Sequence, residues 1–153
     1  MSIDHAKYRV KQLSIFAENK PGMIAAMAKV MRDNDVNILG FSIAEGAGYG
    51  VIRVIVDKPD IAHDMLKKAG FVVKFTDVLA VEMADRPGGL YDLTDMLSRA
   101  GVNIEYGYGY RNEPCAVLII RVEDVDAGIE KILAHGARLL DKDHFQGSCT
   151  KRP

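Results

Sequence analysis

The residues best suited to bind a small molecule lie in a short polar turn that occurs twice. The sequence Asn-Lys-Pro-Gly fills positions 19–22, and Asp-Arg-Pro-Gly fills positions 85–88, 66 residues later. Each turn precedes a helical pattern, and proline suits the first turn of a helix. Backbone N–H groups at a helix N-terminus bind a carboxylate, aided by the helix dipole, and glycine lets a ligand approach the backbone closely. Both turns could therefore hold the carboxylate of an α-amino acid.

An asparagine follows each turn at the same distance. Asn37 lies 18 residues after Asn19, and Asn103 lies 18 residues after Asp85, each within the triplet Val-Asn-Ile. An amide donates and accepts hydrogen bonds, which suits a zwitterion, whereas an ionised carboxylate only accepts and favours the ammonium end. The two copies can therefore differ in ligand or affinity, and one of them can be inactive.

Each of these residues also has a purely structural interpretation. Asn19 and Asp85 stand where asparagine and aspartate commonly cap helices. The glycines suit tight turns, and Asn37 and Asn103 can satisfy nearby backbone groups. Taken singly, helix capping is the stronger interpretation of the turn residues. The shared 66-residue offset favours a common binding role, because a fixed period marks a repeated structural unit.

The elements that position these groups follow one order in both copies, strand-helix-strand-strand-helix-strand. In the first copy we expect strands at 10–17, 36–44, 51–56 and 71–75, one helix starting at Pro21 and one opened by Asp57–Asp60. In the second copy we expect strands at 79–83, 102–110, 115–122 and 137–140, and helices at 87–100 and 124–135.

This order predicts an α+β fold. We expect two ferredoxin-like βαββαβ domains in tandem, each with an antiparallel sheet and its helices on one face. The first domain is expected at 9–76 and the second at 77–145, followed by a polar C-terminal tail at 146–153. Residues 1–9 are polar and are expected to form a loosely held arm. The strands at 51–56 and 115–120 are apolar on both sides, so we expect the open sheet faces to pack against the other repeat or a second chain.

A run of alternating tyrosine and glycine, Tyr106–Tyr110, follows Asn103. In a strand its tyrosines would share one face and pack beneath the helices, while its glycines would leave the face of Asn103 bare for a ligand. In the first copy Phe41 and Ile43 share the face of Asn37 instead. This contrast favours ligand binding in the second copy.

Composition excludes several classes of protein. The formal net charge of −1 over 153 residues gives no long-range attraction to nucleic acid or to an anionic membrane. The sequence contains no apolar run of the roughly 20 residues that a transmembrane helix needs, and its N-terminus has no signal-peptide core. Two cysteines do not form a disulfide framework, so we expect a cytoplasmic protein.

Residue chemistry also gives no sign of catalysis. The four histidines show no paired metal spacing, and no nucleophile, phosphate-binding or zinc-protease motif occurs. Cys115 lies in an apolar strand and is expected to be an inert core residue. We therefore expect no catalytic residue, no metal and no cofactor.

At its two turns and its two Val-Asn-Ile triplets, the sequence resembles the ACT domain family. These domains are small-molecule-binding regulatory modules, many of which bind amino acids. The resemblance covers residues 11–75 and 78–141 as a tandem pair, and the Asn-x-Pro-Gly pattern is similar to that of serine-binding ACT domains. Those domains carry a histidine two residues before the first asparagine. This chain has Ala17 and Met83 there, which suggests a ligand less polar than serine.

The resemblance implies a free amino acid bound at an interface between two ACT units. The implied ligand-binding residues are Asn19, Pro21, Gly22, Met23, Ile24, Asn37, Ile38, Asp85, Arg86, Pro87, Gly88, Gly89, Leu90, Asn103 and Ile104.

The resulting prediction is a non-enzymatic sensor of amino acids that forms a homodimer and reports to an enzyme or regulator of amino-acid metabolism. One alternative is a structural assembly subunit that binds a partner enzyme and has no active ligand site. A second is a small enzyme on the same fold, built around Glu82, Asp85 and Arg86. A metal-responsive regulator is a weaker third, because the histidine and cysteine spacing is poor.

Overall fold

The computed structural model describes residues 2–145, which form two compact units. The first unit comprises Lys11–Thr76 together with the described residues from Asp143 onward, and the second comprises Asp77–Lys142 together with the residues before Lys11. The polar tail expected at 146–153 lies outside the described residues. Among the residues described, no helix is long and apolar enough to cross a membrane.

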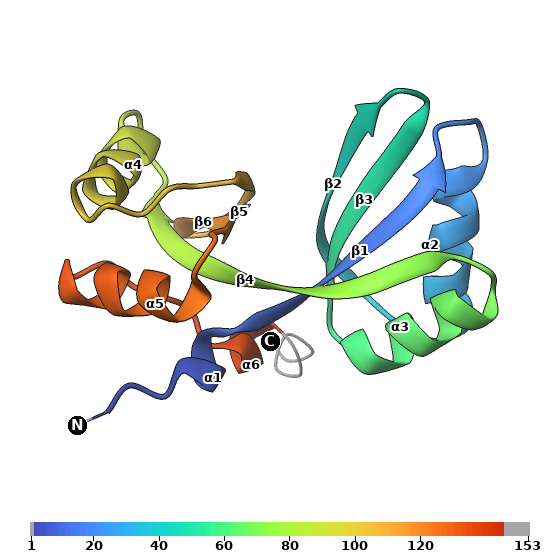
Figure 1. Ribbon diagram of the computed structural model, residues 1–153, viewed down its shortest axis with the longest axis horizontal. Coiled ribbons are helices and arrows are strands. Elements are labelled where there is room, and N and C mark those ends of the chain that lie inside the picture. The colour runs from blue at the N-terminus through green and yellow to red at the C-terminus, as the bar shows by residue number, and fades with distance from the viewer. Residues whose placement is uncertain (1, 146–153) are drawn as a thin grey trace. The chain divides into compact units, whose positions relative to one another are not determined.

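The first unit contains most of four antiparallel strands and two helices. Its elements are β1 (Val10–Glu18), α2 (Met23–Asp33), β2 (Ile38–Gly46), β3 (Tyr49–Val56), α3 (Pro59–Lys68) and the start of β4 (Val72–Ala84). The strand order is β2-β3-β1-β4, and Figure 1 shows α2 and α3 on the same side of these strands. The prediction of a ferredoxin-like unit with helices on one face is confirmed.

Alternating apolar residues build the core of the first unit. Leu13 pairs with Val54 and Ile15 pairs with Ile52, so these four side chains project to one face of the sheet. They pack in one buried cluster with Met27 and other residues of α2 and α3. Burying each of these side chains stabilises the fold by roughly 1.5–3 kcal/mol.

The second unit repeats the design with a shorter last strand. Its elements are the rest of β4, α4 (Gly89–Arg99), β5 (Tyr106–Asn112), β6 (Cys115–Arg121) and α5 (Val125–Ala134), with the strand order β4-β6-β5. The strand expected at 137–140 is only a single antiparallel bridge, between Leu139 and Val81. A last short helix, α6, spans Lys142–Phe145, and from Asp143 onward it groups with the first unit.

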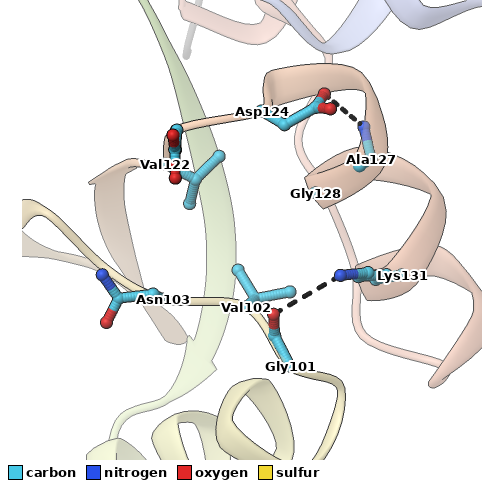
Figure 2. Close-up of a pocket in the computed structure, with 9 residues that line it drawn as sticks. Gly101, Val102, Asn103, Val122, Asp124, Ala127, Gly128 and Lys131 are labelled. Carbon is cyan, nitrogen blue, oxygen red and sulfur yellow. Dashed lines mark hydrogen bonds between the residues drawn. The ribbon is translucent and has the colours of Figure 1, made fainter.

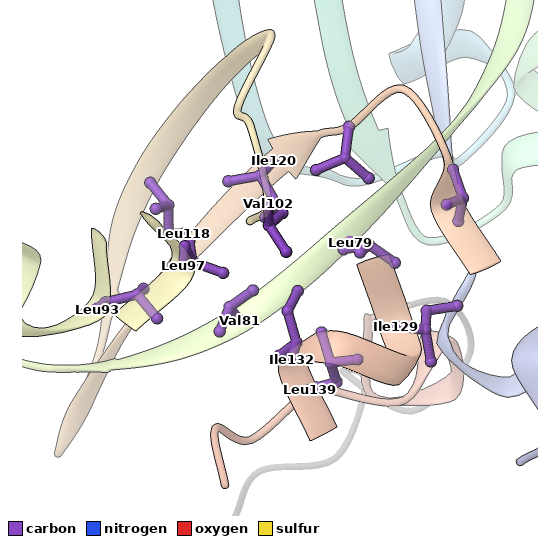
Figure 3. Close-up of a cluster of buried hydrophobic side chains, with 12 residues drawn as sticks. Leu79, Val81, Leu93, Leu97, Val102, Leu118, Ile120, Ile129, Ile132 and Leu139 are labelled. Atoms are coloured by element: carbon purple, nitrogen blue, oxygen red, sulfur yellow. The ribbon is translucent and has the colours of Figure 1, made fainter. Parts of the chain in front are cut away.

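Buried aliphatic side chains from strands and helices form the core of the second unit (Figure 3). The strands contribute Leu79, Val81, Leu118 and Ile120, and the helices contribute Leu93, Leu97, Ile129 and Ile132. On the opposite face of β6, Val117 and Ile119 are also buried.

The expected break between the last strand of the first repeat and the first strand of the second is absent. Two strands were expected, at 71–75 and 79–83, but β4 runs without interruption from Val72 to Ala84. The polar residues Thr76 and Asp77, between the two expected strands, form hydrogen bonds and do not form a turn. The Thr76 hydroxyl is 3.1 Å from that of Ser14, and the Asp77 carbonyl accepts a hydrogen bond from Arg121 at 2.8 Å.

The N-terminal arm is not loosely held. Residues His5–Tyr8 form a short helix, α1, and Tyr8 packs against the core of the second unit. Arg9 donates to Asp77 at 2.7 Å and to Asp126 at 2.6 Å. The hydrogen bond to Asp77, followed by that to Asp126, raises the pKa of Arg9. The arm therefore belongs to the second unit.

Candidate functional site

The two polar turns share an unusual backbone. Gly22 precedes α2 with φ of +90°, and Gly88 precedes α4 with φ of +87°, a left-handed conformation that favours glycine. Neither helix has a side-chain cap among the residues described. The capping interpretation of Asn19 and Asp85 is therefore wrong, and the first-turn N–H groups of both helices are left without a capping side chain.

The turns differ at the next position. Gly89 is buried at the start of α4, and a side-chain carbon there would lie 2.0 Å from the carbonyl oxygen of Ala84. Only glycine fits such a close approach. The corresponding residue of the first unit is Met23, so the two turns cannot offer the same surface to a ligand.

The first polar residue of each turn has its own contacts. The Asp85 carboxylate accepts a hydrogen bond from Nε of Arg111 at 2.7 Å, and 27% of its side chain is exposed. A ligand ammonium would therefore compete with a guanidinium for Asp85. Asn19 is exposed, and its backbone N–H donates to the Gly48 carbonyl at 3.0 Å.

The structure does not bring the turn and the asparagine of one unit together. Asn37 precedes β2 and Asn103 precedes β5, so both lie beyond the C-terminal ends of α2 and α4. The turns lie at the N-terminal ends of these helices. Each helix has 11 residues and spans about 16 Å at 1.5 Å per residue. Asn19 and Asn37 are thus at opposite ends of one unit, and so are Asp85 and Asn103.

Asn103 lines a small cavity of about 170 Å³ in the second unit (Figure 2). Lys131 reaches the Gly101 carbonyl at 3.4 Å, and Asp124 caps α5 by accepting from the Ala127 N–H at 3.0 Å. Figure 2 shows the Asn103 amide on the far side of Val102 from the Lys131 ammonium. Lys131 and Asp124 therefore serve helix ends, and the Lys131 ammonium does not converge with Asn103.

The first unit supports this structural interpretation. There Lys58 donates to the Asp35 carbonyl at 2.5 Å and pairs with the Asp35 carboxylate at 3.1 Å. Position 35 corresponds to Gly101 of the repeat. A lysine thus satisfies the same helix-end carbonyl in both units.

The prediction for the tyrosine–glycine run is wrong in its orientation. Gly107 pairs with Ile120 and Gly109 pairs with Leu118, and both partners belong to the core under the helices. The glycines therefore face the helices, and the tyrosines of Tyr106–Tyr110 face away. The strand starts at Tyr106, so Asn103 is outside its alternation.

The corresponding face of the first unit carries large side chains. Phe41 pairs with Val54 and Ile43 pairs with Ile52 on the helix side, yet Phe41 is 55% and Ile43 47% exposed. A register shift between Ile38 and Gly40 separates Asn37 from this alternation, so Asn37 does not share their face as predicted.

A larger cavity of about 320 Å³ lies beside the second turn, between the end of β4, the first turns of α4 and the loop after α5. Met83, Leu93 and Met96 supply apolar surface, while Arg86 and Asp92 supply charge. The Arg86 guanidinium donates to the Asp92 carboxylate and, at 3.1 Å, to the Pro87 carbonyl. Of the predicted residues, Arg86 and Gly89 line this cavity.

Sequence reasoning missed Asp92 and Met96. Asp92 was detectable as a carboxylate in the first turn of α4 at the position where the first unit has Ala26. Met96 follows Leu93 on the apolar side of the same helix and was indistinguishable from an ordinary core residue. Met83, which stands at the place of the family histidine and was not among the predicted binding residues, also lines the cavity.

The groups considered for an enzyme are occupied by separate partners. Glu82 accepts from the Cys115 thiol at 3.0 Å and pairs with Arg138 at 3.1 Å, whereas Asp85 pairs with Arg111. The hydrogen bond to Glu82 raises the pKa of Cys115, which keeps the thiol protonated. Within residues 2–145, no group of three histidine, cysteine or acidic side chains could hold a metal.

Comparison with solved structures finds a relative of clear sequence similarity. Protein BT0572 from Bacteroides thetaiotaomicron is 36% identical, with a TM-score of 0.86 over 92% of this chain and 97% of that chain. No curated protein matches the chain.

Regulatory subunits of aspartate kinase share the fold at lower identity. That of Thermus thermophilus, in its ligand-free form, is 15% identical with a TM-score of 0.61 over 85% of this chain and 93% of that chain. That of Thermus flavus is also 15% identical, with a TM-score of 0.57 over 84% and 93%. At this identity the likeness concerns the fold and not the function.

A family model for an ACT domain pair matches residues 8–146. This match spans nearly the whole chain. It covers both turns with their left-handed glycines, Gly22 and Gly88, and the helices and strands of both units. The chain therefore belongs to the ACT domain family, as a tandem pair of ACT domains.

Proposed function

We propose that this ACT domain pair is a non-catalytic, cytoplasmic regulatory protein that binds a free amino acid and requires no cofactor. The observation that carries the proposal is the pair of turns, each with a left-handed glycine and helix N–H groups that no side chain caps in the described chain. Such groups are suited to a carboxylate, and family membership makes an amino acid the natural source of it.

Within one unit the polar turn and the asparagine lie far apart. This separation favours a ligand-binding site to which a second ACT unit contributes the asparagine. A ligand held at the Asp85 turn is about one helix length from Asn103 of the same unit. An asparagine from a unit of a second chain can approach the turn without that restriction. We therefore propose a homodimer in which the ligand binds at an interface between ACT units, using the fifteen residues implied by the family resemblance.

Ligand binding at such an interface would report amino-acid level to an enzyme or regulator of amino-acid metabolism. A ligand shifts an equilibrium between two assemblies only by its difference in affinity for them. Coupling free energies of about 1–3 kcal/mol are typical. The alternative of an assembly subunit with no active site predicts the same fold and partner but no response to amino acids.

A thermal-shift screen of the full chain against the free amino acids tests the proposal, with divalent metals as controls. A ligand that binds only the folded state stabilises it by about 2.7 kcal/mol at 100 times its dissociation constant. We expect one class of amino acid to raise the midpoint and Asn37→Ala or Asn103→Ala to reduce the shift. A flat response to every amino acid at millimolar concentration would refute the sensor and favour the assembly subunit.

A further inference from the structure

We infer that the cavity beside α4 is the amino-acid site of the second unit and that it selects an α-amino acid with an apolar side chain. This inference rests on the proposed function and adds the class of ligand, the charged pair that holds it and the number of sites per chain. The observation that supports it is that Arg86, Asp92 and an apolar wall line one cavity.

Glu82 also lines this cavity, but its carboxylate is already engaged by Arg138 and by the Cys115 thiol. His135 lines it too, and its Nδ1 lies 2.8 Å from the Lys131 carbonyl oxygen.

The charged pair matches the two ends of an α-amino acid. Arg86 and Asp92 bond to each other, and their side chains are 58% and 55% exposed. An ion pair this exposed contributes little, so exchanging its partners costs little. A ligand carboxylate can bind the planar guanidinium of Arg86 through two parallel hydrogen bonds, while the ligand ammonium donates to Asp92. A zwitterion therefore supplies each residue with a new partner of the correct charge.

The wall of the cavity sets the side-chain preference. Met83 and Met96 are half-buried, and Leu93 is buried. The methionine side chain is flexible and polarisable, so it adapts to apolar ligands of different shape. Burying a hydroxyl, amide or charge against these residues would cost free energy, because they offer no strong hydrogen-bond partner. The volume of about 320 Å³ lies at the lower end of the range for ligand pockets, which suits a single amino acid.

The first unit lacks the features that make this cavity selective. Its residues at the positions of Gly89 and Asp92 are Met23 and Ala26. Ala26 offers no carboxylate for a ligand ammonium, and Lys20, at the position of Arg86, pairs with Glu18 at 3.2 Å. The geometry therefore points to one such amino-acid site per chain, in the second unit.

Isothermal titration calorimetry of the full chain tests this inference. The probes are leucine, methionine, isoleucine and phenylalanine as apolar ligands, and serine, threonine, aspartate and lysine as polar ones. The amine and the carboxylic acid that correspond to the tightest ligand, each lacking one charged end, complete the set. We expect one apolar amino acid bound per chain, with at least tenfold weaker binding of the polar amino acids and of both truncated analogues.

Three variants locate the site. Asp92→Asn and Arg86→Gln change charge on an exposed surface and should each weaken binding at least tenfold. Asp95→Asn is the matched control, because Asp95 lies on the same helix and pairs at 2.8 Å with Arg99, away from the cavity. Binding to this control should stay within twofold of wild type, and far-ultraviolet circular dichroism confirms that all three variants fold.

The outcomes separate this inference from the proposed function. An amino acid that binds equally well to wild type, Asp92→Asn and Arg86→Gln would overturn the inference and leave the proposed function intact. A preference for polar amino acids, or two equivalent sites per chain, would do the same. If no amino acid binds the wild-type protein, the proposed function and the inference both fail.

Discussion

The backbones of Gly89 and Ala84 approach each other closely at the second turn. A side-chain carbon on Gly89 would lie 2.0 Å from the Ala84 carbonyl oxygen, so the start of α4 presses directly against the end of β4. This contact brings Arg86 and the first turn of α4 beside Met83 and thereby shapes one wall of the cavity. The first unit, which has Met23 at this position, has no such constraint on residue type.

The Gly89→Ala variant should be destabilised because its methyl group would force α4 away from β4. Overpacking of this kind costs about 1–3 kcal/mol in the free energy of unfolding, which urea denaturation measures. Gly46→Ala is the control, since a carbon added at Gly46 meets nothing within 4 Å, and its effect should stay within about 0.5 kcal/mol. Equal effects of the two substitutions would contradict the close contact.

The hydrogen bonds of Arg9 are expected to stabilise the packing of the N-terminal arm on the second unit. Replacing Arg9 with Met removes the hydrogen bonds to Asp77 and Asp126 while keeping the apolar stem. Hydrogen bonds to charged groups contribute about 1.5–3 kcal/mol. The Arg9 side chain is 35% exposed, so solvent screening should reduce the loss to about 1–2 kcal/mol.

Urea denaturation at low and high salt measures this loss, which should shrink as salt screens the ion pairs. Lys7→Met is the matched control, because Lys7 is 4.0 Å from Asp141 and more exposed. If the two variants were equally stable, the arm would not depend on Arg9.

The Cys115 thiol should react slowly, because its hydrogen bond to Glu82 raises its pKa. Only the thiolate is nucleophilic, so a raised pKa leaves less reactive sulfur at a given pH. In Glu82→Gln the negative charge is gone, the pKa falls toward its usual value, and alkylation by iodoacetamide at mildly alkaline pH should accelerate. The measurement is made in a Cys149→Ser background, so that only Cys115 is followed.

Asp95→Asn serves as the control for this experiment, because Asp95 pairs with Arg99 and not with the thiol. It should leave the alkylation rate unchanged. An unchanged rate in Glu82→Gln would show that Glu82 does not protect the thiol.

Met83→His should shift ligand preference toward a polar amino acid. Met83 lines the cavity at the position where serine-binding ACT domains carry histidine. An imidazole can donate or accept a hydrogen bond to a ligand hydroxyl, and one such bond contributes about 0.5–1.5 kcal/mol, or up to about tenfold in affinity. Calorimetry with serine and leucine measures the ratio. Met83→Leu should keep the wild-type preference, and an equal shift in both variants would mean that polarity at this position does not select the ligand.

The sequence alone was sufficient to predict the alternation of strands and helices as far as α5 and most of the core, although two expected strands are one in β4 and the last expected strand is a single bridge. The alternation of Leu13 and Ile15 and the helical spacing of Leu93 and Leu97 are local patterns, and each side chain is buried as its spacing predicted. The 66-residue repeat and the glycines of both turns can also be read directly from the sequence, and they indicated the resemblance to the ACT family. A glycine in a left-handed turn is required by the local backbone, whatever the rest of the chain does.

Tertiary structure decided the features that depend on pairing between distant residues. The glycines of β5 face the helices because Gly107 pairs with Ile120, and no local alternation reveals which face of a strand is inward. Asn103 lies outside β5 because the strand starts only where β6 offers partners. Arg9 reaches carboxylates 68 and 117 residues away. The cavity beside Asp92 likewise forms only when α4 packs onto β4, which brings Asp92 and Met83 to the same wall.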